Sequence, residues 1–144
     1  MDWEKIDPSI DPAELLPLGV RLHGHKGPFL ALGLRMGLLA LRLLGSPGFT
    51  GITAEAHTGT EPPISCLVDG IQIATGCTPG KGNLRVLPGG RPEAVFIANG
   101  RTLRVALREE WLGKVLASGA AEGLTDEILT AIEEELFVWT LSSS

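Results

Sequence analysis

The chain has few basic residues, and nowhere do they gather into a patch. It contains twelve Lys and Arg against seventeen Asp and Glu, which gives a net charge of −5. A surface for nucleic acid or for an anionic membrane needs concentrated positive charge, because phosphate contacts supply much of the binding free energy. We therefore expect no nucleic-acid partner and no membrane partner.

The sequence also has no targeting pattern and no apolar run of membrane length. Its first residues, MDWE, are acidic, unlike the positively charged start of a signal peptide. The most apolar stretch, 29–44, is interrupted by Arg35 and Arg42 and is shorter than a bilayer span. We expect a cytoplasmic protein in which 29–44 is a buried helix.

Cysteine is scarce too, with only Cys66 and Cys77 in the chain. Without a secretory signal, two cysteines are typical of a reducing compartment, where thiols stay free. A disulfide between Cys66 and Cys77 is the alternative.

Several catalytic signatures are missing. There is no Gly-x-Ser-x-Gly, as serine hydrolases have, and no Cys-x-x-Cys, as thioredoxin-like proteins have. The glycine-rich loop 76–82 resembles a phosphate-binding loop, but Gly82 stands where Ser or Thr is required. Nucleotide hydrolysis is therefore not expected, although backbone N–H groups and Lys81 could hold a small anion or carboxylate.

The remaining pattern predicts a single α+β domain over 1–144, with a mixed sheet covered by helices. Asn99-Gly100 between two apolar runs is a strong hairpin signal. The expected helices are 12–19, 29–44, 66–75, 109–118 and 125–141, and the expected strands are 51–56, 83–87, 93–98 and 102–107.

Two features of these helices bear on packing. Apolar residues surround nearly the whole of 29–44, and Gly33 and Gly37 lie on one face of it, where a neighbour could approach closely. The last helix, 125–141, has an apolar stripe. Both surfaces would serve packing within the domain or dimerisation, and we expect a homodimer.

The polar chemistry gathers around histidine and cysteine. His23 and His25 flank a glycine, and a turn there could bring the two imidazoles together. Along an intact helix Cys66 and Cys77 would be on the order of 15 Å apart, so one compact site holds one of them unless a second chain contributes. We favour Cys77, because its glycine-rich loop leaves it free to point at a metal.

Nitrogen and sulfur ligands together favour zinc or a similar divalent transition metal. His57 is a reserve ligand, and Asp69, Cys66 and Lys81 are possible lining residues of the site. The alternative is that the histidines are hydrogen-bonded structural residues and that Asp69 faces solvent.

Three blocks in order resemble the FmdE-like family of formylmethanofuran dehydrogenase proteins over about residues 15–107. They are HGHKGP leading into LGLRMG at 23–37, PPISCLVDGIQ at 62–72 and TGCTPGKGN at 75–83. The resemblance implies an α-β-α-β-β-β core with a mixed sheet and a metal, usually zinc, held by His23, His25 and Cys77. This chain departs from the family pattern in two ways. Gly27 stands where archaeal-type members often carry Cys, and the paired cysteines of the C-terminal zinc ribbon that many members have are absent.

The resemblance leads to three functional hypotheses. The first is a metal-binding accessory subunit or stand-alone homologue. The second is a metal-dependent enzyme of redox or hydrolytic type, in which an open coordination position takes water or a small substrate near Lys81 and Asp69. The third is a structural or dimeric interaction protein without metal. The first two require the imidazoles and Cys77 to meet in space.

Overall fold

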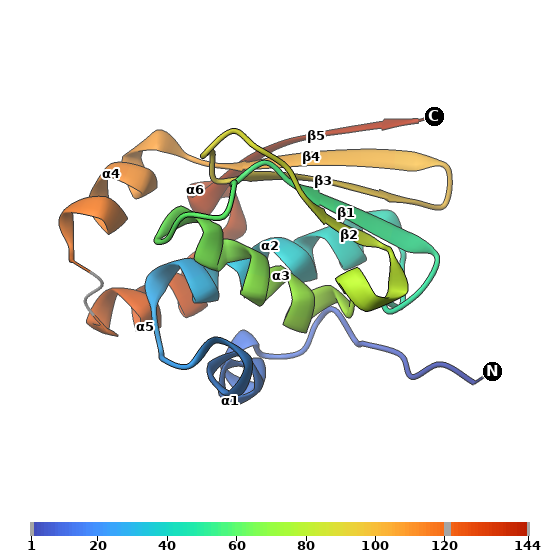
Figure 1. Ribbon diagram of the computed structural model, residues 1–144, viewed down its shortest axis with the longest axis horizontal. Helices are drawn as coiled ribbons and strands as arrows, with labels where there is room; N and C mark the ends of the chain where they lie inside the picture. Colours follow the sequence, from blue (N-terminus) through green and yellow to red (C-terminus); the bar gives the residue numbers. More distant parts are fainter. Residues whose placement is uncertain (1, 120–121, 144) are drawn as a thin grey trace.

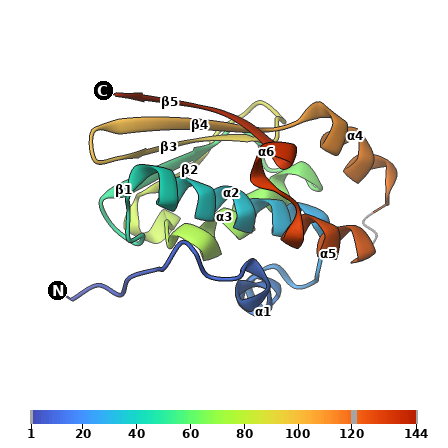
Figure 2. The same ribbon diagram turned by 180° about the vertical axis from the view of Figure 1, so that it is seen from behind.

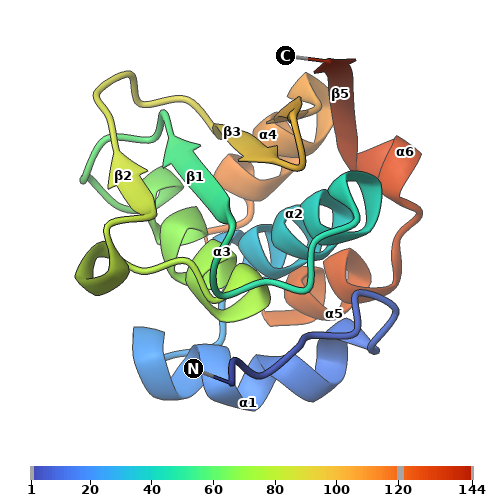
Figure 3. The same ribbon diagram turned by 90° about the vertical axis from the view of Figure 1, so that its right-hand side faces the viewer.

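A computed structural model describes residues 2–119 and 122–143, which form a sheet with helices packed on one of its faces (Figure 1). Helices α2 and α3 lie directly under the strands, and α1 lies beneath those helices, on the side away from the sheet (Figures 1 and 3). The elements are α1 Pro12–His23, α2 Pro28–Leu44, β1 Ile52–Ala56, α3 Leu67–Thr75, β2 Leu84–Val86, β3 Glu93–Ala98, β4 Arg101–Leu107, α4 Glu109–Ala117, α5 Glu122–Thr130, α6 Glu133–Leu136 and β5 Phe137–Ser143, with short 3-10 turns at Ile64–Cys66 and Pro79–Lys81.

The sheet confirms the α+β prediction and the mixed strand directions. Its order is β2-β1-β3-β4-β5, with β1 and β2 parallel and the other pairs antiparallel. From α2 to β4 the chain follows the expected α-β-α-β-β-β order. The predicted hairpin joins β3 to β4, where Asn99 and Gly100 have φ of 53° and 71°, both left-handed as a type I′ turn requires.

The prediction of one helix over 125–141 is wrong. Helix α5 ends at Thr130, and the chain returns as strand β5, which pairs antiparallel with β4 from Leu107–Phe137 to Arg101–Ser143 (Figure 2). The helical spacing of Leu129, Ile132 and Leu136 suggested a continuous helix. Instead, Ile132 is 59% exposed, and the β-favouring residues that follow gain backbone partners on β4.

The first helix is longer than the predicted 12–19. Pro17 lies inside α1, which continues to His23 and ends at Gly24, a left-handed C-cap with φ of 102°. A proline removes only its own N–H and crowds one preceding carbonyl, so the residues after it can still be helical. The consequence for function is that His23 is the last residue of a helix.

Helices α2 and α3 touch through glycine, as the Gly33 and Gly37 pair predicts. A Cβ on Gly33 would clash with the Leu67 carbonyl oxygen, and one on Gly70 would clash with the Leu30 carbonyl oxygen. Glycine on both helices therefore permits backbone-to-backbone contact. Because α2 is buried on nearly all sides within the protomer, it has no apolar face left for a second chain.

No helix in the described part of the chain is long and apolar enough to cross a membrane.

Substitutions of Gly33 and Gly70 test the importance of the contact between α2 and α3. Gly33→Ala or Gly70→Ala is expected to lower the free energy of unfolding by about 3 kcal/mol or more, because the added methyl group overlaps backbone that cannot move aside. Gly113→Ala in α4 is the matched control, since a Cβ there meets nothing within 4 Å. It should be neutral or raise the free energy of unfolding by up to about 1 kcal/mol. Urea denaturation, monitored by circular dichroism, gives the free energy of unfolding of all three variants. Equal changes in the three would contradict the role of the contact between α2 and α3.

Candidate functional site

The two histidines meet where α1 ends and α2 is about to begin. Gly24 reverses the chain between them, and the imidazole centroids of His23 and His25 lie 4.6 Å apart with the rings tilted by 43°. His23 Nδ1 lies 2.7 Å from Oδ2 of Asp69 in the first turn of α3. The glycine turn thus brings the imidazoles together, and α3 supplies a carboxylate partner for one of them.

The hydrogen bonds fix which ring nitrogen is free on each histidine. Ionised Asp69 only accepts hydrogen bonds, so Nδ1 of His23 donates. The Lys26 carbonyl oxygen also only accepts, so Nδ1 of His25 donates to it across 3.1 Å. With both Nδ1 atoms occupied as donors, each neutral ring presents the lone pair of its Nε2. An imidazole held in this way is typical of a metal ligand.

A cavity of about 300 Å³ lies beside these imidazoles. Its polar groups are the two histidines and the Cys66 thiol, and the remaining side chains that line it are apolar. They come from the start of α2, the proline pair before α3 and the end of α4: Pro28, Phe29, Leu30, Pro62, Pro63, Val115 and Leu116. No Asp, Glu, Lys or Arg is among the described residues that line it.

Cys66 is the thiol that shares the site with the histidines. It lines the cavity with His23 and His25, and it lines a neighbouring hollow with His23 and Asp69. Burial raises the pKa of the Cys66 thiol, and the nearby charge of Asp69 raises it further. Cys66 stands at the N-terminus of α3, but with its pKa raised it is not an activated thiolate in the metal-free protein.

Cys77, the thiol favoured from the sequence, lies elsewhere. It follows the C-terminal end of α3 and is fully buried beneath β1, with its Sγ directed at the Ile52 carbonyl oxygen at 3.7 Å. Burial raises the pKa of its thiol as well. Helix α3 has nine residues and is about 13 Å long. Asp69, the partner of His23, is in its first turn, so one protomer does not bring Cys77 together with the imidazoles.

Two further predicted residues also lie outside the cavity. Lys81 is exposed in the turn after α3, where its Nζ donates to the Thr78 hydroxyl at 3.0 Å. His57 follows β1, and its backbone pairs with Glu93 and Arg91. Neither lines the cavity beside His23 and His25.

Among residues 2–119 and 122–143, no three His, Cys, Asp or Glu side chains are already arranged to hold a metal ion. The fold brings together two imidazole nitrogens that could bind a metal, Nε2 of His23 and Nε2 of His25. The Cys66 thiol lies on the wall of the same cavity. A metal could bind both imidazoles and would take its other ligands from Cys66, water or a bound molecule.

The sequence reasoning ranked Cys66 behind Cys77 and missed the apolar walls. A signal for Cys66 was present, because it lies in PPISCLVDGIQ, one of the three family-like blocks. Nothing in the sequence marked Val115 or Leu116, which reach the cavity only through the packing of α4.

A family profile connects this site to known proteins. The profile described as "FmdE, Molybdenum formylmethanofuran dehydrogenase operon" matches residues 22–142, most of the chain. The chain belongs to the FmdE family. The match includes both histidines, Cys66 and Cys77, and it extends past 107, where the resemblance seen in the sequence ended.

The chain is also similar to a curated protein and to a protein of known structure. A protein of Archaeoglobus fulgidus named "Probable S-adenosyl-L-methionine-binding protein" is 31% identical over an alignment of 118 residues that covers 77% of this chain. The chain spans 28% of the length of that curated relative. The crystal structure of a tungsten formylmethanofuran dehydrogenase FmdE-like protein from Syntrophus aciditrophicus has a TM-score of 0.65 and is 24% identical. The structural match covers 99% of this chain and 78% of the Syntrophus chain. It shows that the two proteins share a fold.

The placement of the thiols predicts different reactivities in metal-free protein. Cys66, partly exposed, should react with iodoacetamide, whereas fully buried Cys77 should react only in denaturant. Because the pKa of Cys66 is raised above its ordinary value of 9.0, its rate should still increase with pH above 9. Mass spectrometry of labelled protein measures both, and Cys66→Ser should remove native labelling. Modification of Cys77 in folded protein would contradict this placement.

Proposed function

We propose that this FmdE-family chain is a metal-binding protein, with Nε2 of His23 and Nε2 of His25 as ligands of a divalent transition metal, zinc being the expected ion. The observation that carries the proposal is the pair of Nδ1 hydrogen bonds, which leaves both Nε2 atoms available at the edge of one cavity. The contact from His23 to Asp69 has the carboxylate–histidine form that supports zinc-bound histidines.

Cys66 is the thiol best placed to join these imidazoles. It lines the same cavity, and binding to zinc would favour its thiolate despite the burial. Cys77 remains the ligand expected from the family resemblance, but its burial beneath β1 means that the protomer would have to rearrange, or a second copy contribute. Cys66 is therefore the better candidate.

A site with two or three protein ligands leaves at least one zinc position open. That position would face a cavity of about 300 Å³, which supports a role in binding or converting a small molecule. A purely structural metal site is usually closed by four protein ligands, so the alternative of a metal-dependent enzyme ranks above that of a structural protein. We retain the expectation of a cytoplasmic homodimer, acting as an accessory subunit or alone, and the two free thiols are consistent with a reducing compartment.

S-adenosyl-L-methionine, named for the Archaeoglobus relative, is a weaker candidate ligand. Its ribose hydroxyls and charged amino acid end need several polar partners, and the described lining of the cavity offers two imidazoles and one thiol. The shared region is also only 28% of that relative, so the ligand could bind elsewhere in it.

Metal analysis tests the proposal. Protein purified without added metal should contain near-stoichiometric zinc by inductively coupled plasma mass spectrometry, and His25→Ala should lose it. Cys66→Ser should lower the zinc content more than Cys77→Ser, because only Cys66 lines the cavity. His57→Ala is the control and should leave the content unchanged. Circular dichroism checks that each variant folds.

Two outcomes would contradict this arrangement. A parent protein that neither contains nor takes up a divalent metal would overturn the metal-binding function. Zinc lost from a folded Cys77→Ser protein but retained in Cys66→Ser would restore the ligand set expected from the sequence and reject the one based on Cys66.

The carboxylate contact gives a separate prediction. Asp69→Asn should weaken zinc binding by about tenfold to a hundredfold, because the amide holds the His23 ring less firmly and without charge. Competition with a chromophoric chelator measures the affinity. Glu110→Gln, at an exposed position on α4, removes the same charge away from the cavity and should have no effect. Equal zinc affinities in the parent, Asp69→Asn and Glu110→Gln would show that Asp69 does not support His23 as a zinc ligand.

A further inference from the structure

We infer that the cavity beside His23 and His25 binds a small organic acid, with its apolar chain in the cavity and its carboxylate at the imidazole end. The inference rests on the proposed metal site and goes beyond it by naming the class of ligand.

The walls of the cavity select an apolar body. Seven apolar residues line it, and its polar side chains are those of His23, His25 and Cys66. Water in such a cavity makes few hydrogen bonds, so an alkyl or aromatic group that displaces it gains the hydrophobic free energy. At about 30 Å³ for each water molecule, 300 Å³ corresponds to about ten non-hydrogen atoms. Octanoate, with eight carbons and two oxygens, has this size.

The charge at the polar end selects an acid. Neutral imidazoles contribute no charge, so a divalent ion held by His23 and His25 would keep two positive charges. The Asp69 carboxylate beside His23 offsets one of them, and the other remains while Cys66 is an uncharged thiol. No carboxylate is among the described residues that line the cavity, and an uncompensated charge beside apolar walls is unfavourable. A carboxylate on the ligand would balance the charge and occupy an open position, because carboxylate oxygens are zinc ligands.

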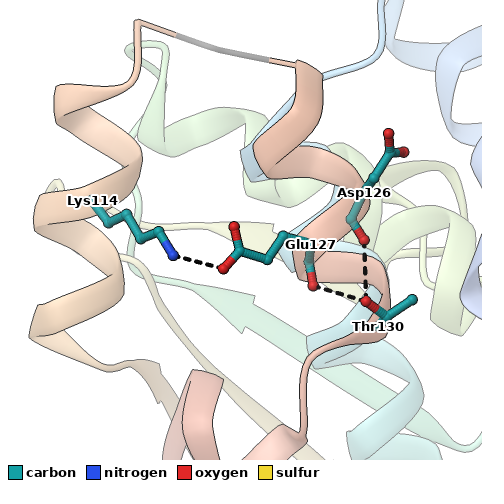
Figure 4. Close-up of polar contacts among 4 residues, drawn as sticks. All are labelled: Lys114, Asp126, Glu127 and Thr130. Carbon is teal, nitrogen blue, oxygen red and sulfur yellow. Dashed lines mark hydrogen bonds and ion pairs between the residues drawn. The ribbon is translucent and has the colours of Figure 1, made fainter.

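Two ion pairs at the surface join segments that line this cavity to the same helix, α5. Lys114 of α4, one residue before Val115, pairs with Glu127 at 2.7 Å (Figure 4). On the other side, Lys26 follows His25 and pairs with Asp126 at 2.8 Å. Adjacent carboxylates of α5 therefore contact both α4 and the loop that carries His25.

A series of straight-chain acids tests the inference. Isothermal titration calorimetry of the zinc-loaded protein with acetate, butanoate, hexanoate, octanoate and decanoate should show affinity rising by up to about fourfold for each added CH₂. The rise should stop near octanoate, where the cavity is full. Octanoate should bind at least tenfold more tightly than octanol, which has the same chain and no charge.

Two matched variants locate the binding. Leu116→Trp places a larger ring at the mouth of the cavity, where Leu116 is 50% exposed, and should weaken octanoate binding at least tenfold. Leu141→Trp makes the same change on strand β5, where Leu141 is 43% exposed, and should leave the affinity unchanged. Both sites are at the surface, so both proteins should fold, and their zinc contents should equal that of the parent.

Three results would overturn the inference: no saturable binding of any acid to zinc-loaded protein, equal binding of octanol and octanoate, or an unchanged octanoate affinity in Leu116→Trp. Each of these leaves the metal site intact, because zinc is measured on the same samples. A parent protein without zinc would overturn the proposed function, and the preference for an acid would fall with it.

Discussion

The contact between α2 and α3 is the constraint on which the site depends. Gly33 and Gly70 let the two helices meet backbone to backbone, and Asp69 precedes Gly70 in the same turn of α3. The position of Asp69 relative to the start of α2 is therefore set by the closest packing in the fold. His23, held by Asp69, takes its ring orientation from this contact, and Cys66 is carried to the same place by the residues just before α3.

This arrangement explains why the chain tolerates glycine inside helices. Glycine in a helix interior costs about 1 kcal/mol relative to alanine, and both α2 and α3 carry it. In return, apolar side chains on both sides of the contact are completely buried, including Leu30, Leu67 and Ile71. Burying one such side chain contributes roughly 1.5–3 kcal/mol, which outweighs the loss of helix propensity.

Local signals in the sequence predicted the parts of the fold that local chemistry decides. The Asn99-Gly100 turn and the two glycines of α2 are examples, and so is the glycine turn that joins the histidines. Strand β5 could not be predicted in this way, because its partner β4 is distant in sequence and its residues also fit a helical spacing. The structure places Cys66 beside the histidines and Cys77 away from them, which the sequence did not show for a related reason. The length of the helix showed that one compact site in a protomer would not hold both thiols. Which end of α3 faces the histidines depends on tertiary packing.

Two of the apolar residues that line the cavity come from a different part of the chain than the other lining side chains, and this has a chemical consequence. The imidazoles, Asp69 and Cys66 lie in the family-like blocks before residue 83, whereas Val115 and Leu116 lie on α4, beyond them. The family match through residue 142 shows that α4 belongs to the shared fold and is not an addition to it. Substitutions on α4 can therefore reshape the apolar wall without disturbing the hydrogen bonds that orient the imidazoles. In a fold built in this way, the shape of the cavity can change while the two imidazoles keep their orientation.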